Sequence, residues 1–228
     1  MARLMKTVAP TVAHCQNSTM SANTPLGTAI AIVVFDGFNE LDSFILSGLL
    51  NQLRPQGWSA ELCGPGRAVT SRNGVTVQLQ RPLEWANEAD VVLFGSGLYH
   101  RAIAENSALL DRLQLDPTRQ LLGAQSSGVL LLARLGLLGD QPASTDPATR
   151  PWLLEAGVRV LDLPFHARGG VATAGGDLAA QYLACWVMLL RAGEGLARSA
   201  LEHAAPVGEA AAYAQNLLAR VKPFVTHS

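Results

Sequence analysis

A four-residue polar break separates two apolar runs in the stretch "LLGAQSSGVLLL" (121–132), and Ser126 lies in the middle of that break. If the first run is a strand and the second a helix, the side chain in the turn faces backbone N–H groups and the positive end of the helix dipole. Such a turn is where α/β enzymes place a serine nucleophile or a cysteine of low pKa. We therefore predict that Ser126 is catalytic and that its neighbour Ser127 contacts the substrate.

A serine hydroxyl is too weak an acid for a helix dipole to ionise, so Ser126 would need a general base. Asp42, at the end of "FDGFNELD" (35–42), is the first candidate, and His100 in "GSGLYHR" (95–101) is the second. Periodicity alone favours Asp42 as a helix N-cap or first-turn carboxylate. Tyr99 and His100 either line a pocket or lie in a solvent-exposed loop, and the sequence supports both interpretations equally.

Strand and helix patterns alternate along the chain and must position these residues. Strands are predicted at 29–35, 59–63, 90–94, 119–124 and 157–162, with hairpins at 68–79 and around Gly169-Gly170. Helices are predicted at 41–53, 101–113, 127–138, 148–156 and 176–192. This alternation favours an α/β fold with a doubly wound parallel sheet and helices on both faces. The loops at 35–42, 95–101 and 124–128 follow strands, so they should converge where such sheets bind ligands.

The amino-acid composition argues against several classes of binding partner. The chain has 228 residues, of which 49% are hydrophobic, and a net charge of −1, so it can bury a sizeable core and has no basic field for nucleic acid or an anionic membrane. We expect a loose tail at 1–24, which lacks the apolar run of a signal peptide, and a single domain at 25–228. Cys15, Cys63 and Cys185 have no metal-ligand spacing, which favours a cytoplasmic protein without a metal.

Four segments together resemble the DJ-1/PfpI superfamily over about residues 28–208. They are "FDGFNELD", with an acidic residue at Asp42; "AQSSGVLLLARLGLL", similar to the superfamily's elbow and following helix; "PASTDP"; and "VATAGGDLAAQYLACWVM". The resemblance implies a flavodoxin-like sheet, a homodimer, a small-molecule ligand and no organic cofactor.

Three departures from the superfamily pattern affect the predicted site. Ser126 stands where relatives normally carry cysteine, and Asp146 stands where a Thr-Thr-His segment often ends. Gly95-Ser96 replaces a Gly-Gly pair whose amides border the site. The resemblance implies Ser126 and Asp42 as catalytic residues, with the Asp42 carboxylate hydrogen-bonded to Ser126 at about 2.6–3.2 Å or through one water. Substrate contacts are predicted at Gly95, Ser96, Tyr99, His100, Ser127 and Asp146.

The resemblance implies an activity like that of isocyanide hydratases, in which water adds to a small electrophile. A ligand-binding or sensing protein without turnover is the first alternative. A serine hydrolase is the second, because Ala124-x-Ser126-x-Gly128 loosely matches a nucleophile elbow and is followed by Asp177 and His203 in a permitted order.

Overall fold

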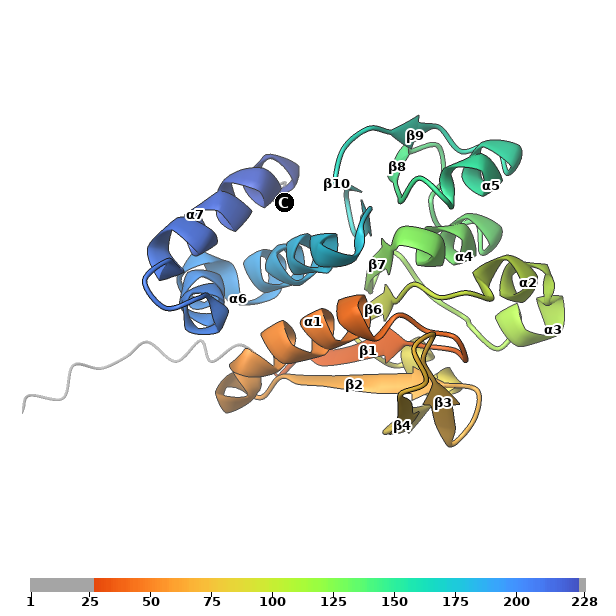
Figure 1. The fold of residues 1–228 in the computed structure, drawn as a ribbon, viewed down its shortest axis with the longest axis horizontal. Helices are drawn as coiled ribbons and strands as arrows, with labels where there is room; N and C mark the ends of the chain where they lie inside the picture. The colour runs from red at the N-terminus through yellow and green to blue at the C-terminus, as the bar shows by residue number, and fades with distance from the viewer. Residues whose placement is uncertain (1–26, 226–228) are drawn as a thin grey trace, which may run out of the picture.

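A computed structural model of the chain describes residues 27–225. The tail predicted at 1–24 lies outside these residues, and the single domain at 25–228 stays a prediction. The centre is a seven-stranded sheet in the order β10-β11-β7-β6-β1-β2-β5 (Figure 1), with only β10 antiparallel to its neighbour. Its strands are β1 (Ala29–Val33), β2 (Ser59–Gly64), β5 (Arg81–Pro82), β6 (Val91–Phe94), β7 (Leu121–Gln125), β10 (Phe165–Arg168) and β11 (Val171–Ala174).

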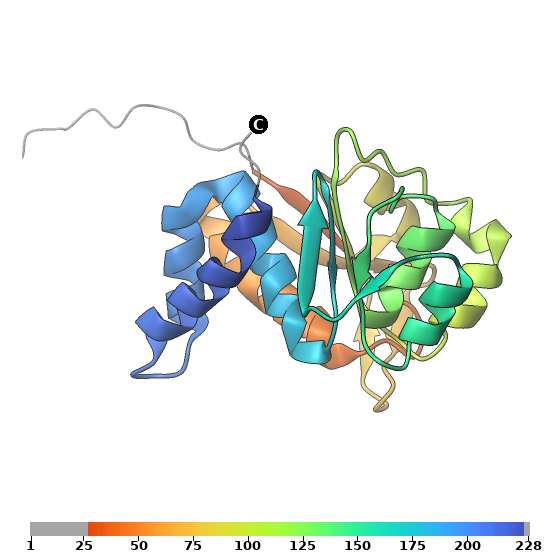
Figure 2. The same cartoon turned by 90° about the horizontal axis from the view of Figure 1, so that it is seen from above.

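Two layers of helices cover the sheet, one on each face (Figure 2). One layer holds α1 (Glu40–Leu50), α6 (Ala180–Ala204) and α7 (Ala210–Val221), and the other holds α2 (His100–Glu105), α3 (Ser107–Leu110), α4 (Val129–Arg134) and α5 (Arg150–Glu155). A hydrophobic core lies on each face of the sheet, and successive residues of β1 pack alternately into the two cores. Ile30 and Ile32 pack into one core, and Ala31 and Val33 pack into the other. The predicted doubly wound, flavodoxin-like α/β fold is confirmed.

Shorter elements complete the described chain. They are the 3-10 helices η1 (Asn51–Gln56), η2 (Leu83–Asn87), η3 (Ser126–Gly128), η4 (Asp177–Ala179) and η5 (Lys222–Phe224), and the strand pairs β3 (Ala68–Thr70) with β4 (Thr76–Gln78) and β8 (Ala143–Ser144) with β9 (Val160–Leu161).

Several helix boundaries differ from the prediction. The helix predicted at 101–113 divides into α2 and α3 because Asn106 interrupts it, and the Asn106 side chain accepts the Leu109 N–H at 3.1 Å to cap the second piece. The helix predicted to end at 138 ends at Arg134, two residues before Gly136 with a φ of 72°. The long helix continues past 192 to Ala204, with a kink at Gly193.

The helix α7 was missed altogether. Its sequence is rich in alanine, and only a narrow stripe of it is buried, where it packs against α6. The buried residues are Ala214, Leu217, Leu218 and Val221. No helix within residues 27–225 is both long enough and apolar enough to cross a membrane.

The β3–β4 hairpin, predicted around Asn73-Gly74, is confirmed and lies outside the central sheet. Hydrogen bonds attach it to the loop between β1 and α1. The Arg72 N–H donates to the Phe38 carbonyl at 2.9 Å, and the Asn73 side chain donates to Glu40 at 2.7 Å. The turn of the hairpin is therefore fixed beside the start of α1.

Candidate active site

Ser126 lies at the turn from β7 into η3 and α4, with a φ of 47°. It is the only non-glycine residue with a positive φ among residues 27–225. For an L-residue this conformation costs about 1–2 kcal/mol, so the surrounding packing must hold it. The strained turn directs the Ser126 side chain into the space between the loops that follow β6, β7 and β11.

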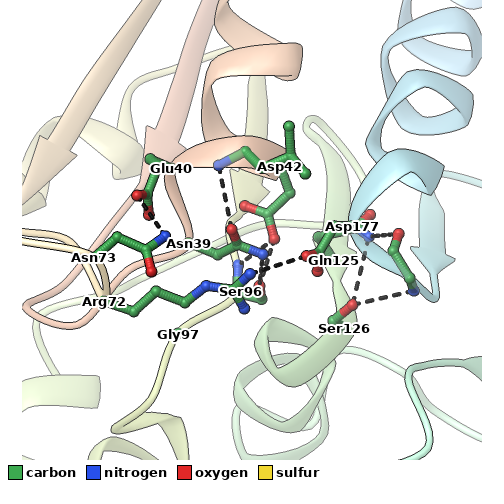
Figure 3. Close-up of polar contacts among 12 residues, drawn as sticks. Asn39, Glu40, Asp42, Arg72, Asn73, Ser96, Gly97, Gln125, Ser126 and Asp177 are labelled. Carbon is green, nitrogen blue, oxygen red and sulfur yellow. Dashed lines mark hydrogen bonds and ion pairs between the residues drawn. The ribbon is translucent and has the colours of Figure 1, made fainter. Parts of the chain in front are cut away.

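Two N–H groups donate to the Ser126 hydroxyl oxygen (Figure 3). The Gly176 amide lies 3.2 Å from Oγ, and the Gln125 side-chain Nε2 lies 3.4 Å from it. Thr145 supports the same turn by donating its hydroxyl to the Ser126 carbonyl at 3.0 Å. Within the described chain, no acceptor takes the Ser126 hydroxyl proton, so that proton is available to a ligand.

Asp42 is fully buried in the first turn of α1. Both the hydroxyl and the N–H of Ser96 donate to its Oδ2, the latter at 3.2 Å, while the Ser43 hydroxyl donates to Oδ1 at 3.0 Å. Burial, with a smaller contribution from the Asp177 charge, raises the pKa of Asp42 to about 7 against the opposing hydrogen bonds from Ser96 and Ser43. The pKa of this carboxyl group is therefore near neutrality.

The direct hydrogen bond predicted between Asp42 and Ser126 is wrong, and the alternative bridge through one water stays a prediction. The Asp42 carboxylate accepts from Ser96 instead, because this chain has a hydroxyl-bearing residue where the superfamily pattern has a second glycine. Of the two local interpretations of Asp42, the first-turn carboxylate is confirmed and the N-cap is wrong. Asn39 caps α1, with its side-chain oxygen accepting the Leu41 N–H at 3.2 Å.

The amides of Gly95 and Ser96 are not free to bind a ligand, contrary to the prediction. The Gly95 N–H donates to the Val33 carbonyl at 3.1 Å, and the Ser96 N–H is taken by Asp42. Ser127 has the remaining candidate amide, since it lies in the first helical turn and its N–H has no partner among the residues described.

His100 is buried and contacts Ser127, with 2.8 Å between its Nδ1 and the Ser127 Oγ. The Gly97 N–H also donates to that oxygen, at 2.9 Å. Burial lowers the pKa of His100 to about 4, so its ring is neutral at pH 7. His100 therefore positions Ser127, and its prediction as a base for Ser126 is not supported by this geometry.

A pocket of about 250 Å³ opens over Ser126. Of the predicted contacts, Ser96, Ser127 and Asp146 line it, whereas Tyr99 is 55% exposed and lies outside the lining. The Asp146 carboxylate is already engaged in accepting the N–H groups of the residues that lead into α5. Sequence analysis did not name the other lining residues, which are Arg72, Gly97, Leu98, Ala148, Thr149 and Trp152.

Asp177 also lines the pocket, and it forms an ion pair with Arg72 at 3.1 Å. His203, in contrast, is exposed in the last turn of α6 and hydrogen-bonds to neither Ser126 nor Asp177. The Ser-Asp-His triad of the serine hydrolase alternative is therefore not assembled. Residues 27–225 also contain no group of three or more His, Cys, Asp or Glu side chains placed to hold a metal ion.

Several solved structures superpose on this chain. A ThiJ/PfpI family protein from Pseudomonas syringae aligns over 94% of this chain and 95% of its own, with a TM-score of 0.71 and 16% identity. Drosophila melanogaster DJ-1beta aligns over 78% and 98%, with a TM-score of 0.69 and 20% identity. Schizosaccharomyces pombe DJ-1 aligns over 78% and 99%, with a TM-score of 0.68 and 16% identity.

The chain has the DJ-1/PfpI fold. The predicted resemblance is thus confirmed at the level of the fold. No protein-family model and no curated protein matches the sequence.

Within this DJ-1/PfpI fold, Gly128 lets the elbow approach the end of β6. A Cβ atom at Gly128 would lie 2.6 Å from the Gly95 carbonyl oxygen and 2.8 Å from that of Phe94. We expect Gly128→Ala to lower the free energy of unfolding by about 2 kcal/mol, because backbone atoms must move to relieve the overlap. Urea denaturation measures the change.

Gly195→Ala is the matched control for this substitution. Gly195 lies in α6, and a Cβ atom there would meet nothing within 4 Å. Alanine at this position should stabilise the protein by about 0.5–1 kcal/mol. Equal effects of the two substitutions would show that the close approach at Gly128 does not constrain the elbow.

Proposed function

We propose that this protein adds water to a small unsaturated electrophile, in the manner of an isocyanide hydratase. One observation carries the proposal. Asp42, a buried carboxyl group with a pKa raised to about 7, accepts the hydroxyl of Ser96, a residue that lines the same pocket as Ser126. A carboxyl group with a pKa near the working pH is suited to both giving and taking a proton.

The chemistry balances for an isocyanide, R–N≡C. Asp42 delivers a proton through Ser96 to the terminal carbon, and the oxygen of a water molecule bonds to that same carbon. The proton released by the water returns through Ser96 to Asp42. The resulting R–N=CH–OH then tautomerises to the formamide R–NH–CHO, so one water is consumed and no electrons are transferred.

In this scheme Ser126 positions the reactants. Its oxygen already accepts two N–H groups, while its proton is free to hydrogen-bond to the attacking water. The Ser127 N–H stabilises the partial negative charge on the oxygen of the attacking water as that water gives up its proton. The scheme therefore requires no ionised serine.

Turnover of cyclohexyl isocyanide tests the proposal, with formation of the formamide followed by NMR. The parent protein should produce N-cyclohexylformamide, and Asp42→Asn should lower kcat/KM about a hundredfold, as expected for loss of a general acid–base. Asp111→Asn is the control, because Asp111 is exposed and its side chain makes no hydrogen bond in the described structure. Failure of the parent to form product, or full activity in Asp42→Asn, would contradict the proposal.

Binding without turnover is a second candidate function. It is favoured by the surroundings of Ser126, whose hydroxyl has no histidine or carboxylate within hydrogen-bonding distance among the residues described. In that case cyclohexyl isocyanide would raise the melting temperature of the parent, and no formamide would form. The homodimer, the cytoplasmic location and the lack of nucleic-acid, membrane and cofactor binding stay predictions.

A further inference from the structure

An arginine side chain lines the pocket that opens over Ser126. Arg72, in the turn of the β3–β4 hairpin, donates from Nη2 to the Asp177 carboxylate at 3.1 Å (Figure 3). Both side chains are about one-third exposed, at 38% and 34%, and both line the pocket. A ligand that reaches Ser126 must therefore lie beside this ion pair.

The two partners come from segments far apart in the sequence, the β3–β4 hairpin and η4. The Arg72 backbone is fixed by its N–H bond to Phe38 at 2.9 Å. Asp177 directly follows Gly176, the residue whose N–H donates to the Ser126 hydroxyl. The Arg72 guanidinium is consequently fixed relative to the same backbone segment that supports the elbow.

Most of the hydrogen-bonding capacity of Arg72 is unused. An arginine side chain carries five N–H donors, and within residues 27–225 the Arg72 side chain makes its hydrogen bond only to Asp177. The remaining donors can bind an oxygen atom of a ligand without breaking the ion pair.

The charges around the pocket restrict what that ligand can be. The carboxylates of Asp146 and Asp177 line the pocket with the Arg72 guanidinium, which leaves a formal excess of negative charge. A ligand carboxylate would gain a bond to Arg72 but would be repelled by Asp177 beside it. A neutral carbonyl or amide oxygen gains the same hydrogen bond without that repulsion.

We propose that Arg72 determines specificity by binding a carbonyl or amide oxygen that a neutral substrate carries beside its isocyanide group, while Asp177 excludes the corresponding carboxylates. This inference rests on the proposed function, because it names the substrate class of the same pocket. It assigns a role to the hairpin, which contributes no residue to the proton-transfer scheme.

Two nearly isosteric probes test the inference, namely N-formylglycinamide, which is neutral, and N-formylglycine, which is anionic at pH 7.5. Calorimetry should show that the parent binds the amide at least about tenfold more tightly than the carboxylate. Arg72→Gln should weaken amide binding about tenfold, as expected for a charged hydrogen bond. Asp177→Asn should lower the preference for the amide about tenfold by improving carboxylate binding.

Arg112→Gln is the control, since Arg112 forms an exposed ion pair with Glu84 away from the pocket and should leave both affinities unchanged. The inference is overturned if neither probe binds the parent, if the two bind equally, or if Asp177→Asn leaves their ratio unaltered. Isocyanide turnover is measured separately. If probe binding changes as expected in the Arg72 and Asp177 variants but no isocyanide is turned over, only the proposed function is refuted. If isocyanide is turned over but the ratio of the two affinities does not change in the variants, only this inference is refuted.

Discussion

Ser126→Cys is expected to produce a thiol that reacts with iodoacetamide at pH 7 more than about a thousandfold faster than Cys63 or Cys185. The Gly176 N–H and the Gln125 amide group already point at the side-chain atom of residue 126, and the helix start adds its dipole. These groups stabilise a thiolate, whereas burial raises the pKa of both Cys63 and Cys185 to about 12. Of these three cysteines, only the new one would be substantially ionised at neutral pH.

The measurement is the pH dependence of alkylation, followed for each cysteine by peptide mapping, with the parent protein as background. Asp42 opposes activation when it is ionised, so we expect it to keep its proton in the variant. An apparent pKa at or above about 8.5, the value of an unperturbed thiol, would show that the elbow lacks an activating field. Such a result would favour binding over catalysis.

Asp42→Asn is expected to change how stability depends on pH. The pKa of Asp42 is about 7 in the folded protein and has an ordinary value of 3.8. At pH values between these two pKa values, the folded state binds more protons than the unfolded state. The stabilising contribution of Asp42 to the free energy of unfolding is therefore present at low pH and is lost as pH rises towards 7. The loss is on the order of 4 kcal/mol, at about 1.4 kcal/mol for each pKa unit.

Asparagine does not titrate, so the variant should lose this dependence and become progressively more stable relative to the parent from pH 4.5 to 7.5. Urea unfolding at several pH values across this range provides the comparison. Asp111→Asn, an exposed site, should follow the parent at every pH. Parallel pH profiles for Asp42→Asn and the parent would mean that Asp42 is ionised in the folded state at neutral pH.

The sequence predicts β1, β2, β6 and β7 of the central sheet because these strands are short, buried and nearly continuous in apolar residues, as in "VVLF" at 91–94. The two-residue strand β5 was missed, and the strand predicted at 157–162 is only β9, which pairs with β8 outside the central sheet. The predicted helix boundaries are wrong where a single residue determines where a helix ends. Asn106 ends one helix and caps the next, and α7 buries too narrow a stripe to stand out from an alanine-rich background. Local patterns thus predicted which elements form more reliably than where they end.

The candidate site was predictable only in part. Ser126 follows from a polar break between a strand and a helix, which is a local signal. The partner of Asp42 depends on Ser96, which is 54 residues away and reaches the carboxylate only in the folded sheet. The position of Arg72 depends on bonds between the hairpin and the loop before α1, and no residue near Arg72 in sequence indicates them.

The separation of the β3–β4 hairpin from the central sheet makes it a replaceable module for protein engineering. Its two strands pair only with each other, and Val69 is its buried apolar anchor. A library randomised at Arg72, with Ser71, Asn73 and Gly74 retained to preserve the turn, would vary the lining of the pocket while the scaffold beneath it stays intact. New ligand preferences could then be selected without redesigning the elbow.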